Sequence, residues 1–152
     1  MIKLGYALSS EEFTPSELIG YAQEAERAGF AFSLISDHFY PWINRQNNSP
    51  FVWSVLGALA QSTQKMTFGT GVTCPTFRIH PLIVAQAAAT AAVMMPDRFF
   101  LGVGSGEYLN EHITRSDWPR PALRLAMPEE AIQLIRTMWQ GDWQISMAII
   151  TL

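Results

Sequence analysis

Short apolar runs alternate with amphipathic segments along the whole chain. The runs typical of strands lie at 2–8, 30–36, 65–72 and 98–104. Each is followed by a segment with apolar residues at helical spacing, at 14–29, 50–63, 80–95 and 128–141. This order predicts an α/β fold, and crossovers of this length predict that the strands are parallel.

The first helical segment carries strong local signals. Thr14 is placed to cap it, Pro15 occupies its first position, and Glu17 completes a capping box. Gly29 is placed to end it. The stretch 105–127 is polar and broken by prolines, so it is predicted to be a loop.

Polar or glycine-rich residues follow every predicted strand. Glu11 follows the first strand and Asp37-His38 the second, while TGVTCPTFR (70–78) and GVGSGE (102–107) follow the third and fourth. Parallel α/β folds build their sites at these strand ends. An open doubly wound sheet would concentrate its site at one point. Four equipped strand ends favour half of an eight-stranded TIM barrel instead.

Composition narrows the class of protein. The chain has 152 residues and a net charge of -3, which fits one globular domain and gives no electrostatic footprint for nucleic acid. No apolar run reaches the ~20 residues of a membrane helix, and the N-terminus lacks a signal-peptide pattern. We therefore expect a cytoplasmic protein without membrane or nucleic-acid partners.

The pair Asp37-His38 is the sharpest candidate for chemistry. A histidine titrates near neutral pH and can take a proton from a substrate hydroxyl. Phe39, Tyr40 and Trp42 follow at once, as in the wall of a pocket. The alternative interpretation is a turn or cap that contains a histidine, with the aromatic residues in the core.

The string GVGSGE is not a dinucleotide fingerprint, because Glu107 stands where the third glycine is needed. Gly102, Gly104 and Gly106 would let the backbone approach a ligand closely. Glu107 is a candidate general acid if its pKa is raised. The alternative is a flexible loop with a solvated carboxylate.

The remaining candidates are weaker. Cys74 is the only cysteine and has no histidine or acidic partner nearby in the sequence, so we interpret it as an unreactive thiol. His80 and His112 lack metal-ligand spacing, and no metal site is expected.

Several strings together carry a family resemblance. They are KLGY, SDHFYPW, PFVWSVLGALAQST, FGTGVTCPTFRIHPLIVAQAAAT and DRFFLGVGSGEYLNEH, and TMWQGD adds a further match. In these strings the chain resembles the luciferase-like (bacterial luciferase-type) oxidoreductases, closest to the deazaflavin-dependent glucose-6-phosphate dehydrogenase branch. The resemblance implies a (βα)8 barrel. It also implies a deazaflavin cofactor, coenzyme F-420 (hereafter F420), at the C-terminal ends of the strands.

The resemblance also implies roles for individual residues. Asp37 would bind the ring or tail hydroxyls of the cofactor, and His38 would act as base on an alcohol. Trp42 would steady the transition state, and Glu107 would protonate the reduced deazaflavin. Glu11 would lie near the substrate mouth.

The resemblance further implies a cofactor cradle. Its implied members are Gly71, Val72, Cys74, Gly106 and Asn110. The bond between Gly71 and Val72 matches a cis peptide that does not involve proline.

The chain also departs from the family pattern. Residues 1–141 correspond to an N-terminal half barrel, and 142–152 are interpreted as a truncated or frame-shifted tail. Gly71 stands where serine is common in the sugar-phosphate branch. The predicted activity is therefore hydride transfer between F420 and an alcohol or sugar-phosphate-type small molecule, by a fragment of little or no activity.

Two alternatives stay open at this point. One is an FMN-dependent luciferase-like monooxygenase, and the other is a half barrel without catalytic function. A half barrel has two open sheet edges and a bare inner face, so a homodimer or other self-association is expected.

Overall fold

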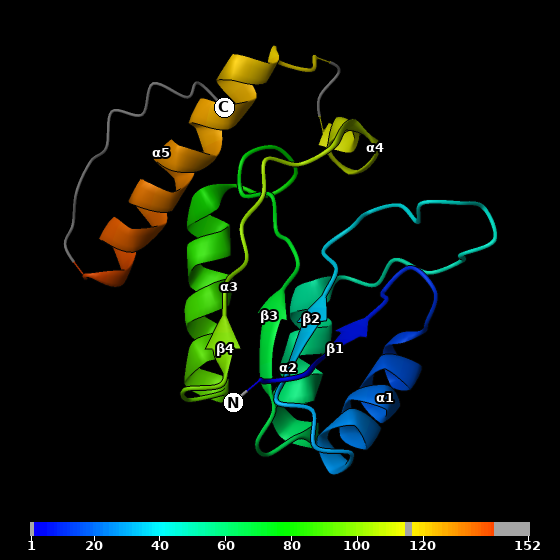
Figure 1. The fold of residues 1–152 in the computed structure, drawn as a ribbon. Helices are drawn as coiled ribbons and strands as arrows, with labels where there is room; N and C mark the ends of the chain where they lie inside the picture. The colour runs from blue at the N-terminus through cyan, green and yellow to red at the C-terminus, as the bar shows by residue number, and fades with distance from the viewer. Residues whose placement is uncertain (1, 115–116, 142–152) are drawn as a thin grey trace.

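A four-stranded parallel sheet forms the centre of the protein, and the computed structural model describes residues 2–114 and 117–141 (Figure 1). The strands lie side by side in chain order: β1 (Gly5–Leu8), β2 (Phe32–Ile35), β3 (Thr67–Thr70) and β4 (Phe99–Phe100). All three pairings are parallel, which confirms the predicted arrangement. The predicted tail 142–152 lies outside the described residues.

One face of the sheet packs against the crossover helices α1 (Pro15–Arg27), α2 (Val52–Ser62) and α3 (Pro81–Met94). The buried core joins these helices to the sheet through Leu18, Leu56, Ile35 and Phe68, among others. The capping box of α1 is confirmed, because Thr14 and Glu17 each accept the backbone N–H of the other.

The other face of the sheet carries no helix among the described residues. Ala7, Leu34, Gly69 and Phe100 lie in register on it, and the exposed fractions of Leu34 and Phe100 are 40% and 39%. In a closed (βα)8 barrel this face is the packed interior.

The predicted loop 105–127 is wrong in part. It contains the short helix α4 (Tyr108–Glu111), a 3-10 turn (His112–Thr114) and the start of α5 (Pro121–Trp139), which packs against α3. Pro121 begins α5 at a position where a missing N–H costs nothing. Pro128 lies inside this helix, where a proline usually breaks it. The prediction failed because the buried side chains of α5 lie on both sides of Pro128 and hold the helix through it.

The strands are also shorter than predicted, most clearly at the fourth. The ladder between β3 and β4 stops at Phe100, and an isolated bridge joins Thr73 to Val103 farther along.

Within the described ranges, no helix combines the length and hydropathy needed to cross a bilayer.

Glu26, near the end of α1, fixes the turn that leads into β3. Its carboxylate accepts the backbone N–H groups of Gln64, Lys65 and Met66 at 2.6–3.1 Å. Burial alone would raise the pKa of Glu26, but these donors outweigh burial and the pKa is lowered. A lowered pKa means that this contribution to stability is present above the unfolded-state pKa. It is lost as the pH falls through the folded-state pKa.

We expect Glu26→Ala to reduce the free energy of unfolding by about 1–2 kcal/mol, because three backbone donors, one of them on the buried residue Met66, lose their acceptor. Urea unfolding at pH 7 and at pH 3 would measure this, and the difference between the two proteins should shrink at the lower pH. Glu24→Ala is the control, since Glu24 only pairs with Arg27 on the surface. Equal losses in the two variants would contradict the assignment.

Candidate active site

The predicted site residues gather at the C-terminal ends of the strands, the end to which the arrowheads point in Figure 1. Glu11 lies in the loop after β1, and His38 lies in the loop after β2. Glu107 comes from the segment after β4 and immediately precedes α4. The structure brings these three side chains into contact, although they are far apart in the sequence.

His38 is at the centre of the group. Its Nδ1 contacts Oε1 of Glu11, and its Nε2 lies 3.3 Å from Oε1 of Glu107. The Trp42 ring stands edge-on to the imidazole, with 5.0 Å between ring centroids. Ser49 donates a hydrogen bond to the backbone carbonyl of His38 at 2.7 Å, so the ring and the main chain are both held.

The electrostatics favour a charged pair of His38 and Glu11. Burial alone would lower the pKa of His38, but the Glu11 carboxylate outweighs it, and Glu107 and Asp37 add to the rise. Burial alone would raise the pKa of Glu11, but its bonds to His38 and Ser36 lower it. The two directions agree, so His38 is a stronger base than an ordinary histidine.

Glu11 is buried in the loop after β1. Besides His38, its carboxylate accepts hydrogen bonds from Ser9 at 3.2 Å and from Ser36 at 3.0 Å. This arrangement lets Glu11 orient the imidazole and stabilise its charge. A direct contact between Glu11 and substrate stays a prediction.

Asp37 has a partner that the sequence did not reveal. Arg78 donates to Oδ1 of Asp37 at 2.7 Å and to its backbone carbonyl at 2.9 Å, and Thr73 donates to Oδ2 at 2.8 Å. The carboxylate is buried, with both oxygens engaged. Its predicted contact with the cofactor therefore stays a prediction, while its link to Arg78 fixes the start of the His38 loop.

The strand-end glycines serve close approach within the protein. A Cβ on Gly102 would lie 2.0 Å from the backbone oxygen of Thr70, and one on Gly104 would lie 2.4 Å from the Val72 side chain. The sequence suggested that these glycines make room for a ligand; the structure shows that Gly102 makes room for the end of β3 and Gly104 for the loop after it. The peptide bond between Gly71 and Val72 is cis, as the resemblance implied.

Cys74 and Glu111 form a buried layer beneath Gly106, which has φ of +72°. Burial, aided by the Glu111 charge, raises the pKa of Cys74 to about 11, so the thiol stays protonated at neutral pH. Burial also raises the pKa of Glu111 to about 7, although the backbone N–H of Arg78 donates to this carboxylate at 3.1 Å. Glu111 was missed, since neither its burial nor its neighbours are visible in the sequence.

Asn110 is fully buried and bonds on both sides of its amide. Its Oδ1 accepts the backbone N–H groups of Phe39 and Tyr40, and its Nδ2 donates to Glu107. Its predicted place in the cofactor cradle stays a prediction.

Among the residues that the structure describes, no group of three or more His, Cys, Asp or Glu side chains is arranged to hold a metal ion.

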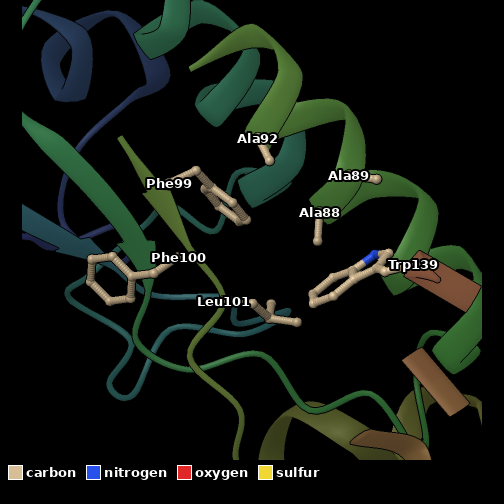
Figure 2. A pocket seen from close by; sticks show the side chains of 7 residues that line it. All are labelled: Ala88, Ala89, Ala92, Phe99, Phe100, Leu101 and Trp139. Carbon is tan, nitrogen blue, oxygen red and sulfur yellow. The ribbon is translucent and has the colours of Figure 1, made fainter. Parts of the chain in front are cut away.

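Two apolar cavities lie along the free edge of β4, apart from this site. Figure 2 shows the first, of about 420 Å³, between α3, β4 and Trp139 of α5. Phe99 and Leu101 point into it, whereas Phe100 points to the opposite face of the sheet. A second cavity of about 440 Å³ shares Leu101 and Trp139 with the first. Neither is lined by a predicted site residue.

The family model of the luciferase-like monooxygenases matches residues 1–147. The F420-dependent glucose-6-phosphate dehydrogenase of Mycobacterium avium is 44% identical over 143 residues, which is 93% of this chain and 43% of that protein. The F420-dependent hydroxymycolic acid dehydrogenase of Mycobacterium tuberculosis is 44% identical over 139 residues, covering 91% and 39%. The chain spans less than half the length of these curated relatives.

Comparison with solved structures points to the same family. An F420-dependent secondary alcohol dehydrogenase in complex with an F420-acetone adduct has a TM-score of 0.91 at 36% identity, over 96% of this chain and 44% of that one. A type II Baeyer-Villiger monooxygenase of Pseudomonas putida in complex with FMN shares only the fold, with a TM-score of 0.79 at 18% identity. These neighbours are luciferase-like TIM barrels, which confirms the predicted fold class. The chain belongs to the luciferase-like monooxygenase family.

Proposed function

We propose that this chain carries the proton-transfer residues of an F420-linked oxidoreductase that takes hydride from an alcohol or sugar-phosphate-type substrate. One observation carries the proposal: His38 lies between the carboxylates of Glu11 and Glu107 at the strand ends. The similarity to F420-dependent dehydrogenases supports the choice of cofactor.

At the C-terminal ends of the strands, the exposed Val72 side chain offers an apolar surface for a flat ring. The Val72 side chain is 46% exposed. It packs against Gly104, and a Cβ on Gly104 would occupy the space that Val72 fills. Nε2 of His38 and Oε1 of Glu107 lie 3.3 Å apart, so a ring would lie against this pair. The residues proposed to hold F420 are Asp37, Gly71, Val72, Cys74, Gly106 and Asn110.

F420, when bound, supplies the acceptor for the hydride that leaves the carbinol carbon. The hydroxyl proton of the substrate goes to Nε2 of His38, because Nδ1 is held by Glu11. Glu11 then stabilises the imidazolium. Trp42 shields this charge from one side. Glu107, in its protonated form, is the proposed donor of the proton that the cofactor would gain together with the hydride.

Titration of the purified chain with F420 and with FMN, followed by absorbance, tests the choice of cofactor, since the two absorb at different wavelengths. We expect saturable binding of F420 and, because the chain spans less than half the length of its curated relatives, only slow reduction of bound F420 by a secondary alcohol. Binding of FMN in preference to F420 would overturn the proposal in favour of the monooxygenase alternative. The single cysteine supports a cytoplasmic location for this chemistry, since free thiols persist in a reducing compartment.

We further propose that a second copy of the chain covers the bare sheet face. β1 and β4 each have a free edge in the described sheet, and exposed apolar side chains, including Leu34 and Phe100, lie on the face between them. The apolar groove beside β4 (Figure 2) would receive part of the partner.

Sedimentation across a concentration series is expected to show dimers, and Leu34→Glu should shift the equilibrium at least about tenfold toward monomer, since it buries an unpaired charge at the interface. Ser16→Glu is the control, because Ser16 is exposed on α1, which packs on the opposite face of the sheet and lines neither the bare face nor the groove. A monomer at every concentration, or equal shifts in both variants, would refute this association.

A further inference from the structure

We propose that Asn110 is a positioning residue: it holds the loop that carries His38 against the segment that carries Glu107. This inference rests on the proposed function, because it explains how the base and the acid are kept in contact. It assigns Asn110 a role within the protein, distinct from a contact with the cofactor.

The hydrogen bonds of Asn110 join the two segments directly. Its Oδ1 accepts the N–H of Phe39 at 2.7 Å and that of Tyr40 at 2.8 Å, and its Nδ2 donates to Oε1 of Glu107 at 2.5 Å. The same Glu107 oxygen lies 3.3 Å from Nε2 of His38. Phe39 follows His38 in the chain, so one buried amide fixes both members of the pair.

Asparagine suits this position for a chemical reason. One side chain must accept two N–H groups and donate to a carboxylate, which a carboxamide can do. Aspartate would keep the acceptors but would set a second carboxylate against Glu107. Alanine would leave two N–H groups of the His38 loop without their acceptor.

Stacked rings connect the same two segments independently. His112 lies between Tyr40 and Tyr108, with centroid distances of 5.8 and 5.0 Å and interplanar angles of 15° and 25°. Nδ1 of His112 is 2.8 Å from the carbonyl oxygen of Tyr108, the residue after Glu107. The Asn110 bonds and this stack therefore form two separate connections between the loop after β2 and α4.

The connection has a measurable electrostatic consequence. Three carboxylates raise the pKa of His38 against the effect of burial: Glu11 from the loop after β1, Glu107 from the segment after β4, and Asp37, which precedes His38 and is paired with Arg78. Glu107 raises the pKa of His38 only while it is held close. Release of Glu107 should therefore lower the pKa of His38 without any change at Glu11.

The test uses cofactor-free protein and two NMR readouts: amide exchange of Phe39 and Tyr40, and titration of the His38 ring. We expect Asn110→Ala to speed exchange at both amides about tenfold and to lower the pKa of His38. Asn110→Asp, which keeps the acceptor, should keep exchange within about threefold of wild type. Asn47→Ala, an exposed change in the same loop, should alter neither readout.

A double-variant comparison separates positioning from general loosening. Glu107→Gln alone should lower the pKa of His38, and Asn110→Ala added to it should lower the pKa no further, because Asn110 acts on His38 through Glu107. Additive shifts, or unchanged amide exchange in Asn110→Ala, would overturn the proposal. Neither readout needs F420, so a failure of F420 binding would contradict the proposed function without touching this inference.

Discussion

Replacing His38 with alanine is expected to lower the rate of alcohol-dependent F420 reduction by about 10²–10⁴-fold, the usual contribution of a positioned general base. The reason is that Glu11 engages Nδ1 of His38, so Nε2, which faces Glu107, is the nitrogen proposed to take the substrate proton. A single-turnover measurement at saturating alcohol isolates this step. F420 affinity should change by less than about threefold, since the imidazole is proposed to act on the substrate.

The matched control is His80→Asn. His80 caps the N-terminus of α3 by accepting the N–H of Leu82 at 3.1 Å, and asparagine can do the same. This variant should keep the wild-type rate. If His38→Ala retained more than about a tenth of the rate, His38 would not be the base.

Glu11→Gln is expected to lower the maximal rate about 10–100-fold and to move the pH profile, because the base loses the carboxylate that strengthens it. Only the deprotonated imidazole can accept a proton, so the rate rises with pH through the pKa of His38. In the wild type that pKa is raised, chiefly by Glu11 against the effect of burial, and the rise falls above the ordinary range of histidine. In Glu11→Gln the rise should fall at lower pH.

The pH dependence of kcat/KM in the two proteins measures this shift. Glu12→Gln is the control, because Glu12 has an exposed side chain next to Glu11 in the sequence. The same pair also bears on stability. Because the folded-state pKa of His38 is raised, the pair's contribution to stability is fully present below the unfolded-state pKa of histidine and is lost as the pH rises through the folded-state pKa. An unmoved profile in Glu11→Gln would exclude Glu11 as the partner of the base.

The sequence was informative wherever local chemistry decides the structure. Alternating segments predicted the parallel sheet, and Thr14 with Glu17 predicted the start of α1. The rule that proline ends helices misplaced the start of α5, because burial of one helix face outweighed the local cost of Pro128.

Contacts between distant segments could not be predicted in the same way. Arg78 and Asp37 are separated by 41 positions, and Asn110 and Phe39 by 71. No spacing rule connects such residues, since only the register of the sheet brings their loops together. The sequence thus placed His38 and Glu107 on one rim but could not show that Asp37 and Asn110 are engaged within the protein.

The proposed function requires a deazaflavin ring to lie over the strand ends, against an imidazole that two carboxylates flank. The most direct measurement is a map of NMR chemical-shift changes as F420 is added to isotopically labelled protein. Saturable changes are expected to be largest at the His38 ring and Val72, with Trp139 in the groove beside β4 unaffected. Changes centred on Trp139, or no saturable change at His38, would contradict the proposed function.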